Sequence, residues 1–252
     1  MTRTVVITGG SGAIGCLLVD GFLSLGDHVF VTTTREDSLA ELQGRILHGR
    51  ERLSGIACDL GEPDAIGALV DAVPDPGPRG VVLVNNARSR RTLRAGADGT
   101  VARPDFMHEY LIDVVVPYEL TLATSGRFTS QLSAVVNIGS QYGSVATNPV
   151  LYEHGDQPGF VHYNVAKAAL HHLTRELAVR LSSHGTRVNA VAYGGLEGRV
   201  DDAFLQRYSA MAPSGRMLKP ADIPGPVIFL ASEHASGVNG HVLAADGGWT
   251  IW

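Results

Sequence analysis

The stretch that decides the fold reads Val5-Val6-Ile7-Thr8-Gly9-Gly10-Ser11-Gly12-Ala13-Ile14-Gly15. Its apolar start predicts a buried strand over Thr4–Thr8, and the apolar residues after the glycines predict a helix over Ala13–Leu25. Glycines between a strand and a helix allow a tight turn and let backbone N–H groups at the helix N-terminus approach a pyrophosphate. This order predicts a dinucleotide-binding site rather than a purely structural turn.

Short apolar runs alternate with helix-length segments along the rest of the chain. Further strands are expected over His28–Thr32, Gly55–Cys58, Gly80–Val84, Ala134–Ile138, Arg187–Ala192 and His241–Ala244. Further helices are expected over Ser38–Leu47, Pro63–Ala72, Pro104–Ser125, Val165–Leu181 and Ala221–Ala231. Most strands are continuously apolar, as expected where helices cover both faces of a parallel sheet. We therefore predict a single α/β Rossmann domain over residues 1–252, with a doubly wound parallel sheet of about seven strands flanked by helices.

Composition and charge exclude several classes of protein. The formal net charge of −5 gives no support for a nucleic-acid-binding surface or a basic membrane-binding face. No apolar run approaches transmembrane length, and no charged leader precedes the first strand, so a cytoplasmic protein is expected. Cys16 and Cys58 lack metal-type spacing, and His108-Glu109 and His171-His172 do not form a zinc motif. No metal site is predicted.

The end of the second strand bears on the choice of cofactor. It reads Val31-Thr32-Thr33-Thr34-Arg35. A site that selects NAD normally places an acid here to hold the ribose 2′-hydroxyl, whereas a guanidinium suits a 2′-phosphate. We predict a preference for NADP(H), with NAD(H) as a possible cofactor. The alternative is that Arg35 only covers a solvated loop.

A tyrosine and a lysine four residues apart are candidates for proton transfer. Tyr163-Asn164-Val165-Ala166-Lys167 leads into the helix expected over Val165–Leu181. Side chains four apart share one helix face, with Cβ atoms roughly 5–6 Å apart. A nearby ammonium favours the ionised phenol, so Tyr163 could act as a general acid and base. Taken alone, the pair is more often an ordinary surface contact.

Over nearly its whole length the chain resembles the short-chain dehydrogenase/reductase family. The glycine turn is similar to the family's Thr-Gly-x-x-x-(Gly/Ala)-x-Gly, with Gly9, Ala13 and Gly15 in the key places. Tyr163 and Lys167 match Tyr-x-x-x-Lys, and Ser140, just after the fifth strand, looks like the catalytic serine. The remaining matches are Asp59-Leu60, Asn85-Asn86-Ala87, Asn189 with Gly194 and Gly195, and Asn239-Gly240 with Asp246-Gly247-Gly248.

The resemblance implies hydride transfer between C4 of a nicotinamide and a carbonyl carbon. Tyr163 would exchange the proton, Ser140 would bind the carbonyl oxygen, and Lys167 would favour ionised Tyr163 and hold the nicotinamide ribose. The substrate would be a small polar carbonyl or alcohol, either sugar-like or a 3-oxoacyl compound. Cofactor contacts are expected from Gly9, Ser11, Gly12, Ala13, Ile14, Gly15, Arg35, Asp59, Leu60, Asn86, Ala87, Tyr163, Lys167, Gly194 and Leu196.

The chain departs from the family pattern at several positions. Arg88 replaces a glycine, and Tyr193 replaces a proline. Asp113 stands where the family has an asparagine that helps to hold a proton-relay water; an ionised Asp accepts hydrogen bonds but cannot donate them. These changes leave open the alternative of a cofactor-binding protein without redox turnover, or one that uses the cofactor structurally for a non-redox reaction.

Three segments bear on substrate and assembly. The longer interval before Tyr163, Asn148–Pro158, resembles a branch associated with bacterial surface-sugar biosynthesis, but it could equally be a tolerated surface loop. Residues 196–218 resemble a flap that closes on substrate. The apolar tail Trp249–Trp252 would pack across the interface of a homodimer or homotetramer, as relatives assemble.

A basic run follows the fourth expected strand. It consists of Arg88, Arg90, Arg91, Arg94 and Arg103. Because this run begins at the carboxyl edge of the sheet, one or more of its guanidinium groups could meet a phosphate or carboxylate of the substrate. The alternative is a solvated loop or a subunit contact.

Overall fold

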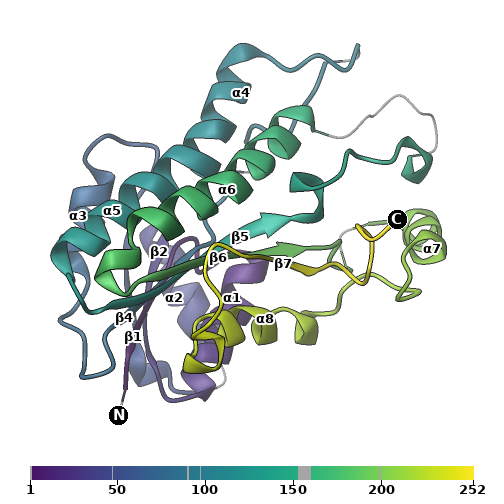
Figure 1. The fold of residues 1–252 in the computed structure, drawn as a ribbon. Coiled ribbons are helices and arrows are strands. Elements are labelled where there is room, and N and C mark those ends of the chain that lie inside the picture. The colour runs from purple at the N-terminus through teal and green to yellow at the C-terminus, as the bar shows by residue number, and fades with distance from the viewer. Residues whose placement is uncertain (1, 47, 90, 97, 153–159, 199) are drawn as a thin grey trace.

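The computed structural model describes residues 2–46, 48–89, 91–96, 98–152, 160–198 and 200–252. Within them, one parallel sheet has the strand order β3-β2-β1-β4-β5-β6-β7 (Figure 1). Its strands are β1 Thr4–Ile7, β2 His28–Thr33, β3 Leu53–Ala57, β4 Val81–Asn85, β5 Leu132–Ser140, β6 Arg187–Tyr193 and β7 Val242–Ala245. The order reverses between β1 and β4, and open α/β sheets bind their ligands at such a switch point.

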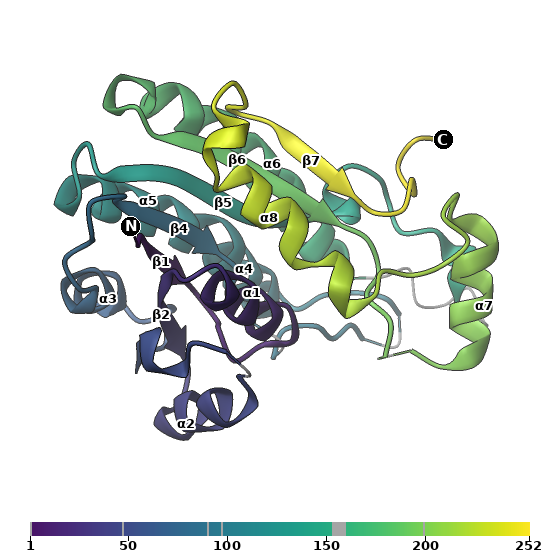
Figure 2. The same cartoon turned by 90° about the horizontal axis from the view of Figure 1, so that it is seen from below.

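Helices cover both faces of the sheet (Figure 2). The helices are α1 Ala13–Ser24, α2 Glu36–Arg45, α3 Ala65–Ala72, α4 Arg103–Tyr110, α5 Val116–Arg127, α6 Val161–Arg180, α7 Asp202–Met211 and α8 Pro224–Leu230. α1, α2 and α8 contribute to the core on one face, whereas α3, α5 and α6 contribute to the core on the other. None of the helices in the described ranges is long and apolar enough to cross a membrane.

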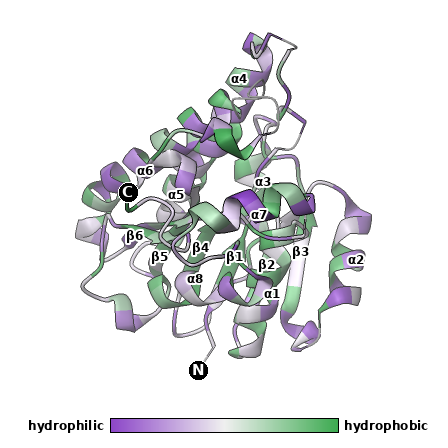
Figure 3. Cartoon of the chain, turned by 90° about the vertical axis from the view of Figure 1, so that its right-hand side faces the viewer, coloured by the Kyte–Doolittle hydropathy of each residue, from purple (hydrophilic) through white to green (hydrophobic). Residues whose placement is uncertain are grey.

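The central strands are mostly apolar because both of their faces are buried. Val5 and Ile7 of β1 belong to the core beneath α1, while Val6 between them belongs to the core beneath α3 and α5. Successive strand residues point to opposite faces, so both sets must be apolar. Figure 3 shows the resulting band of apolar strands behind more polar outer helices. The predicted single-domain Rossmann fold with seven parallel strands is confirmed.

Three expected helices differ from the structure. The helix predicted over Pro104–Ser125 is two α-helices, α4 and α5, joined by one π-helical turn over Leu111–Val115. The helix predicted over Ala221–Ala231 is a 3₁₀ turn, Pro220–Asp222, followed by α8, since Pro224 restarts the helix. α6 begins at Val161 rather than Val165, so Tyr163 lies inside its first turn. The predicted end of the second helix, Leu47, lies outside the described residues.

One helix was not predicted at all. α7 lies inside the segment 196–218, and the Asp201 carboxylate caps it by accepting a hydrogen bond from the Phe204 N–H (2.7 Å). The two ends of this segment meet in a bridge between Leu196 and Leu218. The segment therefore leaves and rejoins the domain at one place, at the carboxyl end of β6.

Candidate active site

Two cavities open at the carboxyl edge of the sheet. One has a volume of about 520 Å³ and is lined by the glycine turn, the end of β5, the start of α6 and the loop after β6. The other, of about 300 Å³, lies toward the ends of β2 and β3. Gly9, Thr34 and Arg88 line both. The cavities thus form adjoining parts of one cleft at the switch point of the sheet.

Most of the predicted cofactor contacts line this cleft. The first cavity is lined by Gly9, Ser11, Gly12, Ala13, Ile14, Gly15, Asn86, Tyr163, Lys167, Gly194 and Leu196. The second is lined by Gly9, Asp59, Leu60 and Ala87. Arg35 lines neither cavity: its guanidinium lies 3.7 Å from the Glu41 carboxylate, and its side chain is 67% exposed. Thr34, its neighbour, is the β2-end residue that faces both cavities.

The glycine turn has no room for side chains at three positions, Gly9, Gly10 and Gly15. Gly9 has φ +66°, and a Cβ there would lie 2.9 Å from the Ala87 Cα. A Cβ on Gly15 would lie 2.3 Å from the Gly9 carbonyl oxygen. The end of β1 is tied to the end of β4, since the Thr8 hydroxyl accepts hydrogen bonds from the N–H groups of Asn86 and Ala87 (2.9 and 2.8 Å). This close backbone packing leaves a cradle that fits a pyrophosphate at the N-terminus of α1.

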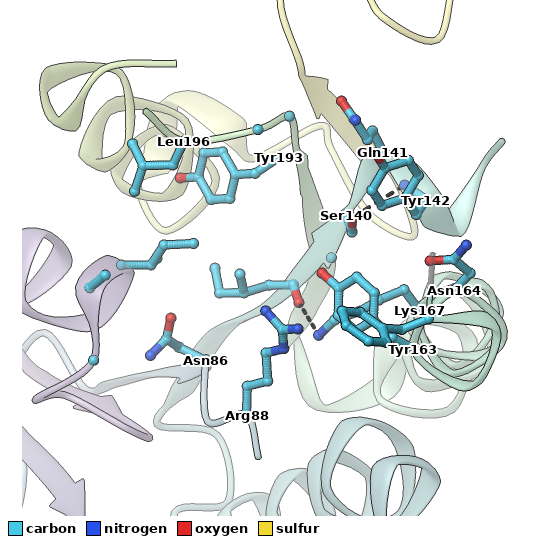
Figure 4. A pocket seen from close by; sticks show the side chains of 18 of the residues that line it. Asn86, Arg88, Ser140, Gln141, Tyr142, Tyr163, Asn164, Lys167, Tyr193 and Leu196 are labelled. Atoms are coloured by element: carbon cyan, nitrogen blue, oxygen red, sulfur yellow. Dashed lines mark hydrogen bonds between the residues drawn. The ribbon is translucent and has the colours of Figure 1, made fainter. Parts of the chain in front are cut away.

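Ser140, Tyr163 and Lys167 meet in the first cavity (Figure 4). Ser140 is the last residue of β5, and its hydroxyl accepts a hydrogen bond from the Tyr142 N–H (3.2 Å). The buried Lys167 donates a hydrogen bond to the Ile138 carbonyl (3.0 Å), and its Nζ lies 5.6 Å from the centre of the Tyr163 ring. Two elements more than twenty residues apart in sequence therefore bring together a hydroxyl, a phenol and an ammonium.

Asp113 lies directly behind Lys167. Its carboxylate is 2% exposed and lies 3.2 Å from the Lys167 Nζ. Within the described ranges neither carboxylate oxygen has a partner in hydrogen-bonding geometry. The π-helical turn Leu111–Val115 carries Asp113 at its centre. Such turns are rare and frequent at functional sites.

Arg88 enters the cavity where the family pattern has no side chain. Its guanidinium carbon lies 4.3 Å from the centre of the Tyr163 ring, a cation–π distance (Figure 4). The sequence indicated added bulk and charge at this position. In the structure the Arg88 guanidinium is stacked on the phenol of Tyr163, the residue that the family resemblance implies to be the general acid.

Tyr193 has a structural role. Its hydroxyl donates a hydrogen bond to the Ile223 carbonyl, and burial raises the pKa of its phenol well above its usual range. The ring packs in the core shared with α8 and also lines the first cavity. A phenol takes the place of the family's proline and ties β6 to the residue before α8.

The sequence did not single out Gln141 or Tyr208, and it assigned Trp249 to a subunit interface, whereas Trp249 is buried against Tyr208 in the same chain. The Tyr208 hydroxyl donates to the Gln141 side-chain oxygen and accepts from the Gly195 N–H, both at 2.9 Å. Its ring stacks on Trp249, with centres 4.4 Å apart. The recurrence of Phe204, Tyr208 and Met211 at helical spacing was the available signal. These contacts hold α7 against the end of β5 and the loop after β6.

Of the remaining candidate segments, some residues line the cleft and others do not. Residues 153–158 of the insertion lie outside the described residues, but Tyr152 lines the first cavity and packs edge-on against Phe204. Of the basic run, Arg88 and Arg91 line the second cavity, and Arg94 is paired in bidentate fashion with Asp105 (2.7 and 3.1 Å). Arg103 opens α4 and lines neither cavity, and Arg90 lies outside the described residues.

Fold and site together define a dinucleotide-dependent oxidoreductase, and comparison with known proteins agrees. The family model described as "Enoyl-(Acyl carrier protein) reductase" matches residues 10–250. Galactitol 2-dehydrogenase from Rhizobium johnstonii is 33% identical over 98% of this chain and 95% of its own length. An uncharacterized short-chain type dehydrogenase/reductase, y4vI of Sinorhizobium fredii, is also 33% identical over 98% of this chain, which spans 43% of that longer relative.

Solved structures give the same result. A short chain dehydrogenase from Leptospira borgpetersenii with bound NAD+ superposes with a TM-score of 0.85 at 26% identity, covering 100% of this chain and 94% of that one. The Pseudomonas aeruginosa RhlG/NADP complex gives 0.83 at 25% identity, covering 98% and 96%. This chain belongs to the short-chain dehydrogenase/reductase family of oxidoreductases, as its motifs predicted.

Proposed function

We propose that this protein is an NADP(H)-dependent oxidoreductase that interconverts a carbonyl and a secondary alcohol on a small polar substrate, sugar-like or oxoacyl. The observation that carries the proposal is the convergence of Ser140, Tyr163 and Lys167 in one cavity beside the glycine turn. A hydride donor is supplied by the nicotinamide when it is bound. The glycine cradle and Lys167 would hold the cofactor, because the first leaves room for phosphates and the second offers N–H donors.

The protein's own groups handle the proton and the substrate oxygen. In the reductive direction Tyr163 gives its hydroxyl proton to the carbonyl oxygen, and Ser140 donates a hydrogen bond to that oxygen as negative charge develops. Lys167, fixed by the Ile138 carbonyl, places its positive charge beside the Tyr163 ring and favours the phenolate that remains. The reverse sequence serves oxidation of the alcohol.

The lining of the cavity supports a polar substrate of modest size. Its far wall combines amide and hydroxyl groups of Gln141, Asn164 and Thr147 with the rings of Tyr142 and Tyr152. Hydrogen-bonding groups between rings suit a hydroxylated carbon chain or ring. Galactitol 2-dehydrogenase, named for a sugar alcohol, is among the relatives, which supports this class.

A preference for NADP(H) rests on the end of β2. No acidic side chain stands in Thr32-Thr33-Thr34-Arg35. Arg35 is exposed, and its guanidinium contacts to Glu41 (3.7 Å) and to Ser38 (3.4 Å) are long, so it can turn to a 2′-phosphate. Solved relatives hold NAD+ in one case and NADP in another. Equal or better KM for NADH than for NADPH would overturn the preference.

The test of the proposed function is Tyr163→Phe. NADPH oxidation is followed with a panel of ketohexoses and ethyl acetoacetate, and NADPH binding is measured by calorimetry. We expect turnover to fall by roughly 10²–10⁴-fold with NADPH affinity within about threefold of wild type, because only the proton donor is lost. Near-normal turnover in the variant would remove Tyr163 from this role. Tight NADPH binding by wild type without turnover on any panel compound would favour the non-redox alternative, which the stacked Arg88 motivates.

We also propose that the protein works in the cytoplasm as a homodimer or homotetramer. The support is an apolar end of the chain that a single copy leaves in water: Ile251 is 74% exposed and Trp252 is 80% exposed. Contiguous exposed apolar groups of this kind usually mark an interaction surface.

A further inference from the structure

A buried polar cluster lies behind Lys167, on the side away from the substrate cavity. It contains Thr92, Glu109, Asp113 and His162, whose exposed fractions are 4%, 1%, 2% and 0%. The side chains come from the loop after β4, from α4, from the π-helical turn and from α6, and α4 packs along α6 (Figure 1). So much buried polarity is costly unless the groups are paired.

Hydrogen bonds join part of the cluster. The Thr92 hydroxyl donates to Glu109 Oε2, and the Thr92 carbonyl accepts a hydrogen bond from His162 Nε2 (2.7 Å). Because a carbonyl can only accept, Nε2 carries the hydrogen, and Nδ1 of a neutral His162 is an acceptor. Thr92 therefore fixes the orientation of both titratable side chains.

Other atoms of the cluster have no such partner. Among the residues that the structure describes they are Glu109 Oε1, Asp113 Oδ2 and His162 Nδ1, while Asp113 Oδ1 has only its ion-pair contact with the Lys167 Nζ. Buried polar atoms in folded proteins are nearly always bonded to protein or to ordered water. The cluster reaches the Lys167 ammonium through Asp113, and a catalytic role is one explanation for such exceptions.

The acidic residues form a row along one helix face. Asp105, Glu109 and Asp113 follow at intervals of four, so they lie above one another along α4 and into the π-helical turn. At the outer end Asp105 is paired with Arg94, whose side chain is 73% exposed. At the inner end Asp113 lies 3.2 Å from the Lys167 Nζ. The row thus runs from solvent to the active-site lysine.

The buried surroundings of Glu109 shift the pKa of its carboxyl upward. Burial raises the pKa of the Glu109 carboxyl, and the Asp113 carboxylate raises it further. The Thr92 hydroxyl, the Arg88 guanidinium and His162 act in the opposite direction and do not cancel the effect. Glu109, whose pKa is raised, thus stands one helical turn from Asp113, which lies 3.2 Å from the Lys167 Nζ.

We propose that Glu109, held by Thr92, is a positioning residue that stores the proton with which the Lys167–Asp113 pair restores Tyr163 after each reduction. After Tyr163 has given up its proton, the Lys167 ammonium transfers one to the phenolate. Glu109 releases its proton to Asp113, Asp113 passes it to the Lys167 amine, and Glu109 regains a proton from solvent at the Arg94–Asp105 end. Each transfer breaks one O–H or N–H bond and forms one, and the net input is one proton. This proposal rests on the proposed function.

An infrared measurement tests the stored proton without turnover. The wild-type protein at neutral pH should show the carbonyl band of a protonated carboxylic acid, which Glu109→Gln removes. Glu119→Gln, an exposed change of the same kind on α5, should leave the band unchanged. Thr92→Val should shift the band, since it removes only the hydroxyl that donates to Glu109. That shift assigns the band to Glu109 even if Glu109→Gln does not fold. A wild-type spectrum without the band overturns the proposal.

Kinetics test the transfer. With the panel compound that wild type reduces fastest, Glu109→Gln should lower kcat by about tenfold, raise the solvent deuterium isotope effect and leave both KM values within about twofold. Glu109→Asp should recover part of the rate, and Glu119→Gln should match wild type. A kcat, pH profile and isotope effect equal to wild type in Glu109→Gln overturn the proposal. Loss of turnover in Tyr163→Phe beside a normal Glu109→Gln rejects the relay alone, whereas normal turnover in Tyr163→Phe rejects the proposed function.

Discussion

Arg88 illustrates how one residue can change an otherwise familiar site. A side chain replaces a hydrogen atom at a position beside the glycine turn, and it reaches the face of Tyr163. Its guanidinium is exposed in a cleft built for an anionic cofactor. A cation in this place can bind a phosphate, and it also adds to the positive field at the phenol.

We expect Arg88→Gln to weaken NADPH binding by about tenfold, because it removes charge-assisted hydrogen bonds worth roughly 1–1.5 kcal/mol. Calorimetry at two salt concentrations measures this, and the difference should shrink at high salt. Arg103→Gln, on the exposed start of α4, is the matched control. Equal affinity of Arg88→Gln and wild type would limit Arg88 to stacking on Tyr163.

His171 connects the site to the pH dependence of stability. Its ring fills the space beside Gly139 and Gly143, where a Cβ would come within 2.5 Å of it. Burial lowers the pKa of its imidazole from 6.5 to about 4, and the charges of Lys167 and Arg175 act in the same direction. The unfolded chain therefore takes up a proton between these values while the folded protein does not.

The free energy of unfolding should be at its full value above pH 6.5 and fall as the pH is lowered toward 4, by on the order of 2–3 kcal/mol from this residue. Urea unfolding at pH 7.5 and pH 5 measures the loss. His171→Asn should be less stable at pH 7.5 but should lose less on acidification. His172→Asn, on the exposed face next to it, should keep the wild-type difference. If His171→Asn lost as much free energy of unfolding between pH 7.5 and pH 5 as wild type does, His171 would not be the source of the pH dependence.

Among the elements, the break between α4 and α5 matters most. The π-helical turn over Leu111–Val115 places Asp113 against Lys167 and continues the row that starts at Asp105. The local sequence, Leu-Ile-Asp-Val-Val, is apolar and helix-compatible, so it predicted a continuous helix. A π-helical turn inside a helix is rare and is found frequently at functional sites, so a helix-compatible sequence does not predict it.

α7 is held in place mainly through Tyr208. Tyr208→Phe removes a donor to Gln141 and an acceptor for Gly195 while keeping the stacking on Trp249. We expect a loss of about 1–2 kcal/mol in the free energy of unfolding, and a several-fold rise in the substrate KM with little change for NADPH. Urea unfolding and steady-state kinetics measure these, with the exposed Tyr118→Phe as control. An unchanged substrate KM would show that α7 does not shape the substrate site.

At the scale of the whole molecule, the C-terminal tail divides into a buried and an exposed half. Trp249 is 7% exposed against Tyr208, whereas Ile251 and Trp252 are 74% and 80% exposed. The buried half completes the wall behind α7. In the exposed half, the Ile251 N–H donates a hydrogen bond to the Gly248 carbonyl (3.3 Å), but both apolar side chains remain largely in water.

The double substitution Ile251→Ser with Trp252→Ser should lower the molar mass in light scattering at micromolar concentration, because it removes apolar area from the proposed subunit interface. The exposed Leu25→Ser, at the end of α1, should keep the wild-type mass. A wild-type protein that is already monomeric would make the predicted assembly wrong.

The sequence alone determined the sheet, the glycine cradle and the chemical groups of the site. Continuous apolar strands need cover on both faces, and parallel strands gather their carboxyl ends at one edge, so Ser140, Tyr163 and the residues after β1 and β4 could be placed together from pattern alone. Arg35 shows the limit of such reasoning: its position at the end of β2 was predictable, but not that its side chain would point away from the cleft.

Only the tertiary structure decided which side chains from other segments pack around the site residues. Glu109, His162 and Thr92 lie in separate segments with no shared motif, and Tyr208 reaches Gln141 across 67 residues. A local pattern records which face of an element is apolar, but not which side chain of another element it meets. Which side chains meet depends on how the helices pack and on the π-helical turn that directs Asp113 toward Lys167. Both are fixed only when the complete core packs.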